Sequence, residues 1–307
     1  MTGAGLRQGV FPIAPTPFHD NGDLDLDGQR RVMDCMVDQG VDGICILANY
    51  SEQFLLSDAE RDTLLTVCLE HIAGRVPVIV TCSHFSTGVA VARARQAAAA
   101  GASMLMMMPP YHGALLRATD AGVYEFFAAL SQAVDIPIMV QDAPLSGANL
   151  PVPLLARIAT ELPQVAYFKI EVPGTAGKLR ALIDAAGDAI AGPFDGEEGI
   201  TLMADLDAGA TGTMPSALMP ELIRPVVEHH LAGDRQAAAA QYARILPLIN
   251  YENRQCGLRA CKTAMREGGV ITSDAVRHPL EPLPPQTREE LLRLAGDLDV
   301  LALRWGK

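Results

Sequence analysis

The sequence has 307 residues, of which 49% are hydrophobic and 20% are charged, and its formal net charge at pH 7 is −12. This composition is typical of a globular protein with a large core, and the acidic balance argues against nucleic acid or an anionic membrane as a partner. Six cysteines without a CxxC pair, no apolar signal region at the start and no membrane-spanning apolar run predict a cytoplasmic protein with buried thiols.

Short apolar segments alternate with amphipathic segments along the first three quarters of the chain. Most of the apolar segments are apolar on both faces, which predicts eight buried parallel strands: Val10–Ala14, Gly43–Asn49, Pro77–Ser83, Ser103–Pro109, Pro137–Ala143, Val165–Glu171, Ala189–Asp195 and Gly212–Ser216. The amphipathic segments predict helices between them: Leu26–Gln39, Ser57–Ala73, Thr87–Ala100, Thr119–Val134, Val152–Leu162, Ala176–Ala186, Glu197–Ala208 and Pro220–Leu231.

Eight successive strand–helix units predict a (β/α)8 barrel. A doubly wound sheet is the alternative, but no GxGxxG follows the first strand and there is no Walker loop. After the eighth unit only helices are predicted: Arg235–Ile249, Asn253–Glu267 and, beyond a proline-rich loop, Thr287–Leu303. We therefore expect a catalytic barrel over residues 1–232 and a C-terminal helical region over residues 233–307.

The sixth predicted strand, Val165–Glu171, carries Lys169 near its end. The chain has only four lysines, and an ammonium in a buried strand is costly to desolvate. Lys169 is either a structural lysine paired with Glu171 on the same strand face, or an amine whose pKa is lowered by burial so that it forms a Schiff base with a carbonyl. The segment alone leaves both interpretations open.

In a (β/α)8 barrel the chemistry occurs where the strands end, so the polar residues at the predicted strand ends are candidates for the site. They are Asn49, Tyr50 and Ser51 after the second strand, His84 after the third, Tyr111 after the fourth, Gln141 on the fifth, Lys169 and Glu171 on the sixth, Asp195 on the seventh and Thr213 on the eighth. Each residue alone is weak evidence, because polarity normally resumes at a strand end. Together they surround the mouth of the barrel on which Lys169 would open.

Two other chemistries are less well supported by the sequence. A metal site at His84, His112 and the acidic segment Asp195–Glu198 lacks HxxxH or HxH spacing, and the acidic segment also suits the first turn of a helix. A serine hydrolase would require GxSxG, which is absent. The sequence therefore predicts a site without a metal ion and without a cofactor.

The lysine on the sixth strand, the turn Ala48–Glu52 and the Pro-Tyr turn at Tyr111 resemble the dihydrodipicolinate synthase / N-acetylneuraminate lyase family. The resemblance covers essentially the whole chain, including the helical tail. It implies a cofactor-free enzyme that forms a Schiff base between Lys169 and a 2-oxo acid. It also implies a homo-oligomer, a tetramer in this family, in which Tyr111 reaches the site of a neighbouring subunit.

Three departures from the family pattern narrow the expected reaction. Val140 stands where most members have a proton-relaying tyrosine, Leu145 stands where an arginine binds a second carboxylate, and Asn49-Tyr50 replace two threonines. Dihydrodipicolinate synthesis is therefore not expected. The pattern resembles instead the members of the family that dehydrate 2-keto-3-deoxy sugar acids.

For such a dehydratase we expect Lys169 to form the imine, Glu171 to move protons, and Gln141 to hold water or the leaving hydroxyl. The turn at Tyr50 and Ser51 would bind the substrate carboxylate, and Asn49 and His84 would contact distal hydroxyls. Two alternatives remain open at this point. One is a Schiff-base aldolase that releases pyruvate, and the other is a non-catalytic sensor of 2-oxo acids on the same barrel.

Overall fold

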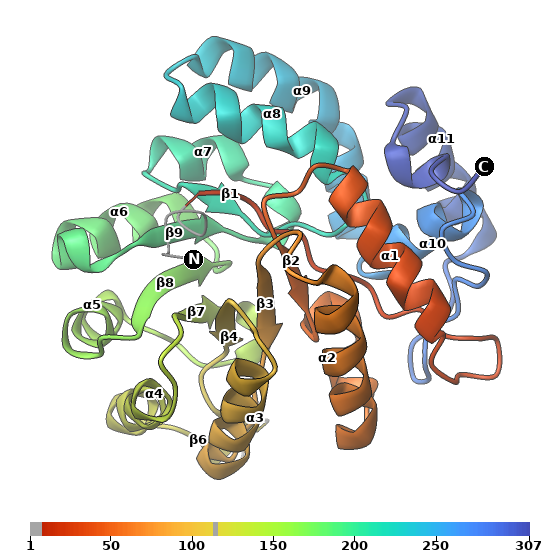
Figure 1. Ribbon diagram of the computed structural model, residues 1–307. Coiled ribbons are helices and arrows are strands. Elements are labelled where there is room, and N and C mark those ends of the chain that lie inside the picture. The colour runs from red at the N-terminus through yellow and green to blue at the C-terminus, as the bar shows by residue number, and fades with distance from the viewer. Residues whose placement is uncertain (1–7, 113–115) are drawn as a thin grey trace. The chain divides into compact units, whose positions relative to one another are not determined.

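A computed structural model of the protein describes residues 8–112 and 116–307 (Figure 1). The chain divides into two compact units. The unit that contains Pro77–Gly196 and Thr201–Thr213 is called the Lys169 unit here, and the unit that contains Gly9–Val76, Glu197–Ile200 and Met214–Lys307 is called the Ser51 unit. The helices that follow residue 232 belong to the Ser51 unit, and a boundary between residues 232 and 233 stays a prediction.

The Lys169 unit is built on a parallel sheet whose strands are adjacent in chain order: β3 (Val78–Thr81), β4 (Met104–Met107), β7 (Ile138–Asp142), β8 (Val165–Ile170), β9 (Gly192–Asp195) and β10 (Gly212–Thr213). Each lies inside a predicted strand. Nearly all of their side chains are buried, as expected for parallel strands covered on both faces.

Helices connect these strands and follow one another along the outside of the sheet in this unit (Figure 1). They are α3 (Thr87–Ala99), α4 (Asp120–Ala133), α5 (Val152–Glu161), α6 (Thr175–Ala186) and α7 (Leu202–Asp207). One element was not predicted: β5 (Tyr111–His112) and β6 (Leu116–Arg117) pair as a short antiparallel ribbon. Residue Tyr111 therefore lies on a strand rather than in an open loop.

The Ser51 unit contains β1 (Gly9–Val10), β2 (Ile44–Ile46), α1 (Leu26–Asp38), α2 (Asp58–Ile72), α8 (Pro220–Leu231), α9 (Arg235–Tyr251), α10 (Arg259–Glu267) and α11 (Pro285–Asp297). The first strand is shorter than predicted: beyond Val10 only Ile13 forms bridges, to Cys45 and Ser216. Pro12 and Pro15 flank Ile13 and have no N–H to donate, so a continuous ladder cannot form there.

Three predicted helices have different bounds in the structure. The helix predicted from Glu197 begins only at Leu202, because Glu197 and Glu198 are left-handed, with φ of 53° and 60°. The acidic segment therefore does not form the first turn of a helix. The helix predicted over Asn253–Glu267 is a π-helix, Glu252–Cys256, followed by α10, and the one predicted to Leu303 ends at Asp297.

All six cysteines are buried thiols. Between residues 8 and 112 and between 116 and 307, no helix combines the length and apolarity that crossing a membrane requires.

Candidate active site

Lys169 lies next to the end of β8 with 3% of its side chain exposed, and its ammonium forms an ion pair with Oε1 of Glu171. Gln141 is in register with Lys169 on the neighbouring strand β7, and its Nε2 donates to the same Oε1 at 3.1 Å. The structure thus brings the three predicted catalytic residues together on one face of the sheet. The ion pair is present, and it also places a carboxylate beside the amine, as proton transfer at an imine requires.

Gly196 leaves the room that this pair occupies. A Cβ at Gly196 would lie 2.9 Å from Cε of Lys169 and 3.0 Å from Oε1 of Glu171, and it would lie closer still to Cγ of Glu171. Both side chains therefore pack directly on the backbone of Gly196. Sequence reasoning missed this residue, although a glycine immediately after a strand signals a close approach to the backbone.

The second polar atom of the Gln141 amide is available for a ligand. Oε1 of Gln141 is buried, and among the described residues it accepts no hydrogen bond. Buried polar atoms are rarely left without a partner. A substrate hydroxyl or a water molecule beside Glu171 would satisfy it.

The opposite face of the same strands carries a second lysine–carboxylate pair. Asp142 is in register with Ile170, and Nζ of Lys178 from α6 lies 2.5 Å from its Oδ2. Burial raises the pKa of Asp142, and the charge of Lys178 opposes that effect. Lys178 therefore anchors α6 to the sheet behind Lys169, and it had no role in the sequence analysis.

The predicted site residues Asp195 and Thr213 lie on that opposite face as well. Asp195 is in register with Ile170 and with Thr213, and the Thr213 hydroxyl donates to its Oδ2 at 2.5 Å. Both side chains are fully buried, and burial raises the pKa of Asp195 well above its usual range. The structure brings these two residues together with Asp205 of α7, but the register does not place them on the Lys169 face.

Asp205 was missed by the sequence analysis, and a signal for it existed. Leu202, Asp205 and Leu206 share the buried stripe of α7 at helical spacing, so a carboxylate was placed among core residues. Its Oδ2 accepts from the Thr201 hydroxyl at 2.6 Å. Burial raises its pKa.

His84 and Tyr111 belong to the Lys169 unit too. The partly exposed His84 follows β3, and its Nδ1 accepts from the backbone N–H of Ser86 at 2.9 Å, which directs Nε2 to other partners. Tyr111 is half-buried, and burial raises its pKa to about 12, so the phenol is a proton donor at neutral pH.

In the Ser51 unit, the predicted carboxylate-binding turn is a short 3₁₀ helix, Asn49–Ser51. The Ser51 hydroxyl donates to the carbonyl of Ala14 at 2.6 Å and accepts from the N–H of Ala48, and the Thr16 hydroxyl donates to the Ser51 carbonyl. Ser51 therefore builds the turn. The carboxamide oxygen of Asn49 accepts from Nε2 of Gln53 at 2.6 Å, so the NH2 group is the part of the Asn49 amide that remains to donate.

The turn is held by residues far along the chain. Glu52, left-handed with φ of 57°, forms a 2.7 Å ion pair with Lys262 of α10, and both side chains are fully buried. Its other oxygen accepts from the N–H of Arg277 at 3.1 Å, and the Lys262 ammonium lies 4.4 Å from the centre of the Phe18 ring. Burial lowers the pKa of Lys262, while the charge of Glu52 opposes this. The C-terminal helices thus fix the geometry of the turn.

The acidic segment does not converge as a metal site would require. Asp195 faces Thr213, whereas Glu198 accepts from Nδ2 of Asn253 at 2.6 Å. Outside residues 1–7 and 113–115, no group of three His, Cys, Asp or Glu side chains is placed to hold a metal ion. The side chain of His112, the third residue of the metal site considered from the sequence, lies outside the described part of the chain.

A lysine at the carboxyl end of a parallel strand, paired with a carboxylate, defines a site of the class that uses a lysine amine on carbonyl substrates. Comparison with known proteins gives the family. The model of the dihydrodipicolinate synthetase family matches residues 6–297, and the chain belongs to this family. The resemblance predicted from the sequence is confirmed.

One solved structure supports the fold, and two curated relatives show which members of the family the chain is similar to. A crystal structure of dihydrodipicolinate synthase from Rhodopseudomonas palustris is 29% identical, covers 94% of this chain and 97% of its own, and has a TM-score of 0.85. The predicted (β/α)8 barrel with C-terminal helices is confirmed. L-2-keto-3-deoxyarabonate dehydratase from Azospirillum brasilense is 58% identical over 299 residues, which is 97% of each chain. A 4-hydroxy-tetrahydrodipicolinate synthase from Streptomyces coelicolor is 30% identical over 92% of each chain.

Proposed function

We propose that this chain is a Schiff-base dehydratase that converts L-2-keto-3-deoxyarabonate to 2-oxoglutarate semialdehyde and water. The observation that carries the proposal is the buried cluster of Lys169, Glu171 and Gln141. The 58% identity to a dehydratase of that name supports the choice of substrate.

The reaction begins at the lysine. The neutral amine of Lys169 attacks C2 of the 2-oxo acid, and loss of water gives an imine. The protonated imine withdraws electrons from C3 and so acidifies the hydrogens there. Glu171 already contacts Lys169, so its carboxylate is placed beside the imine and can receive a proton from C3.

Dehydration then requires a proton at the C4 hydroxyl. Glu171 delivers the proton that it took from C3, the C4–O bond breaks, and water leaves. Gln141 donates to Glu171 through Nε2 and offers Oε1 to the departing hydroxyl or water. The conjugated imine loses a C5 proton to give an enol, which becomes the terminal aldehyde. Hydrolysis of the imine returns Lys169 and releases the product.

Cleavage of the C3–C4 bond would need a different group. An aldolase takes the proton from the C4 hydroxyl, which becomes a carbonyl, and a strand tyrosine suits that task. Here the corresponding position is Val140, which is fully buried on β7 and has no proton to exchange. The retained Glu171 and Gln141 favour loss of water.

The remaining predicted residues take supporting roles. The turn at Tyr50 and Ser51 binds the substrate carboxylate, and Asn49 and His84 contact the distal hydroxyls. Asp195 and Thr213 shape the site from the other face of the sheet. Tyr111 reaches a neighbouring subunit of a homotetramer, and the enzyme is cytoplasmic; both are expectations from the family.

Product analysis tests the proposal. The protein is incubated with 2-keto-3-deoxy-pentonates of both C4 configurations, and we expect 2-oxoglutarate semialdehyde from the L-arabonate derivative with little pyruvate. Mainly pyruvate and a two-carbon aldehyde would identify an aldolase and overturn the proposal. No turnover at all, with binding retained, would identify a sensor.

Trapping the imine tests the mechanism separately. Borohydride added with pyruvate should leave a covalent adduct on the tryptic peptide that contains Lys169, because an imine is reducible and an ion pair is not. Lys169→Arg should fold and be inactive, because a guanidinium stays protonated. A peptide without the adduct in the wild-type protein would exclude the Schiff base.

A further inference from the structure

Asp195 of β9 and Asp205 of α7 form a pair of carboxyl groups in hydrogen-bonding contact. Both side chains are fully buried. The surroundings of the two are alike: Oδ2 of Asp195 accepts from Thr213, and Oδ2 of Asp205 accepts from Thr201. Oδ1 of each aspartate is buried and, within the described residues, has no donor.

Two ionised carboxylates in this arrangement would be strongly unfavourable. Their charges would repel in a medium of low dielectric constant, and two buried oxygens would lack a donor. A single proton removes both problems, because a protonated carboxyl donates one hydrogen bond and an ionised carboxyl accepts it. We propose that Asp195 and Asp205 hold one proton between their Oδ1 atoms, carried by Asp195, so that Asp195 stays neutral close to Lys169.

The two carboxyl groups differ in their surroundings. Burial is the main cause that raises the pKa of Asp195, and the hydrogen bond with Asp205 and the charge of Asp205 raise it further, against the Thr213 hydroxyl and the Lys169 ammonium. Burial also raises the pKa of Asp205. There, however, the hydrogen bond from Asp195, the Thr201 hydroxyl and the charge of Arg180 all oppose the rise. Asp205 is therefore the ionised partner.

A neutral Asp195 matters for the chemistry of Lys169. The Lys169 ammonium and Asp195 interact electrostatically, and Glu171 already forms an ion pair with that ammonium. An ionised Asp195 would be a second carboxylate near Lys169 and would favour the ammonium over the amine that attacks C2. Asp205 is thus a positioning residue that acts through Asp195 without touching substrate. This step rests on the proposed function, since it assumes that Lys169 forms an imine.

Asp205→Asn tests the role of the pair. The amide of the new side chain donates to Oδ1 of Asp195 and so stabilises its ionised form. The pKa of Lys169 then rises, and we expect the pH midpoint of adduct formation at Lys169, with pyruvate and cyanoborohydride, to move up by about one unit. In D195N/D205N no carboxylate remains in the pair, and the midpoint should return to that of the wild type.

Asp207→Asn is the matched control, because it removes one carboxylate from the same helix at an exposed position. Its midpoint should equal that of the wild type. An unmoved midpoint in D205N, or an equal shift in D207N, would overturn the proposal. An equal shift in D207N would mean that the loss of a negative charge from α7, or a disturbance of that helix, moves the midpoint without any involvement of Asp195.

Infrared spectroscopy of the wild-type protein tests the proton itself and needs neither turnover nor an imine. Glu252, whose pKa is raised to about 8, adds the same protonated-carboxyl signal to every variant, so the spectra are compared as differences. We expect the carbonyl stretch of one protonated carboxyl at pH 7 in the difference between the wild type and D205N, and again between the wild type and D195N/D205N. Difference spectra without that band would refute the shared proton. If the band is present and no adduct forms on Lys169, the proposed function fails while the proton assignment stands.

Discussion

Gly196→Ala is a direct test of how closely the reaction depends on the position of Glu171 and Lys169. The backbone of Gly196 is not left-handed, so alanine is compatible with its conformation. The new Cβ would lie 2.9 Å from Cε of Lys169 and 3.0 Å from Oε1 of Glu171, where ordinary contact begins at 3.4 Å. The lysine must then move by about 0.5 Å, and the glutamate, which is closer at Cγ, by more.

A displacement of this size should lower activity strongly. Misplacing a reacting group by about 1 Å costs on the order of 10²-fold in rate, so we expect kcat to fall by about 10- to 100-fold. The rate of imine trapping with pyruvate should fall with it, because the amine itself is displaced. KM should change less than kcat, since the substitution does not alter the turn at Tyr50 and Ser51 that is proposed to bind the substrate carboxylate.

Gly177→Ala is the matched control. Gly177 lies inside α6, and nothing lies within 4 Å of the position where its Cβ would be. Alanine there should keep full activity and raise the free energy of unfolding by about 0.4–1 kcal/mol. Steady-state kinetics, trapping rates and thermal unfolding are measured for both variants. Turnover within about 3-fold of the wild type in G196A would refute the claim that Gly196 sets the geometry of the pair.

Four further outcomes are expected. Glu171→Gln should reduce turnover by about 10²–10⁴-fold while pyruvate trapping stays detectable, and near-full turnover would make Glu171 a structural partner only. Lys262→Met leaves the buried charge of Glu52 without its partner and should lower the free energy of unfolding by about 3–5 kcal/mol in denaturant titrations. The double variant E52Q/K262M should recover part of this loss. A loss below about 1 kcal/mol in Lys262→Met would contradict the importance of the pair. Burial raises the pKa of Glu252 from 4.5 to about 8, so between these pH values the folded protein holds a proton that the unfolded chain releases. The free energy of unfolding should therefore fall as pH rises from 4.5 to about 8. In Glu252→Gln this part of the fall should be absent from melting curves taken between about pH 5 and 9. Activity should survive exhaustive chelation, and a loss that one divalent ion restores would return Asp195 and Glu198 as metal ligands.

Local patterns were enough to predict most of the strands and the pairing of Lys169 with Glu171. Lys169 stood out because a lysine in an apolar strand is rare, and the two-residue period of a strand placed Glu171 on its face. The order of strands in a barrel then made Gln141 a neighbour. These inferences needed only residues close in sequence or on consecutive strands.

What the sequence did not predict depends on contacts that are remote in the chain or on backbone geometry. Glu52 and Lys262 are separated by 210 positions and meet only through the tertiary fold. Asp195 was expected at the mouth of the barrel because it ends a strand, but that pattern carried no sign of its contact with Asp205 on α7. The left-handed turn at Glu197 and Glu198 has no propensity signal, because glutamate rarely adopts positive φ.

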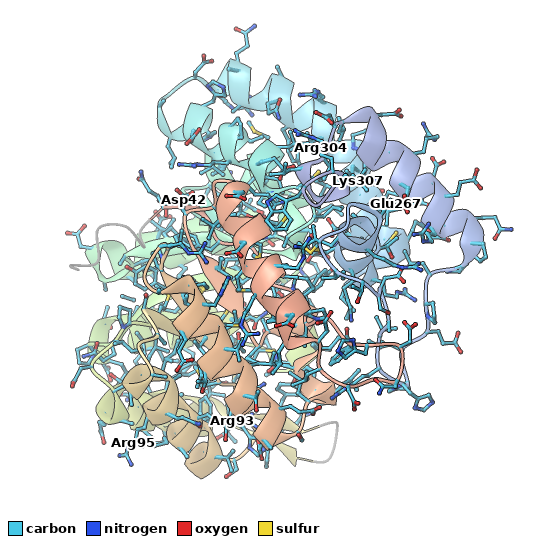
Figure 2. The ribbon with its side chains drawn as sticks, turned by 45° about the vertical axis from the view of Figure 1, so that its right-hand side comes forward. Asp42, Arg93, Arg95, Glu267, Arg304 and Lys307 are labelled. Carbon is cyan, nitrogen blue, oxygen red and sulfur yellow. The ribbon has the colours of Figure 1, made fainter. Side chains whose placement is uncertain are left out.

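The proposed reaction releases an aldehyde, and the placement of the protein's amines and thiols bears on its survival in contact with that product. Aldehydes react with amines and thiols. Of the 24 lysine and arginine residues only four are lysines, and the other 20 are arginines, whose guanidinium groups stay protonated and react poorly. Lys169 and Lys262 are buried, Lys178 is paired with Asp142, and Lys307 is exposed beside Glu267 near the end of the chain (Figure 2). The thiols are buried, and burial raises the pKa of Cys35, Cys68 and Cys256 to about 12. The folded enzyme thus offers its own product few nucleophiles, and partial unfolding would expose it to covalent self-modification.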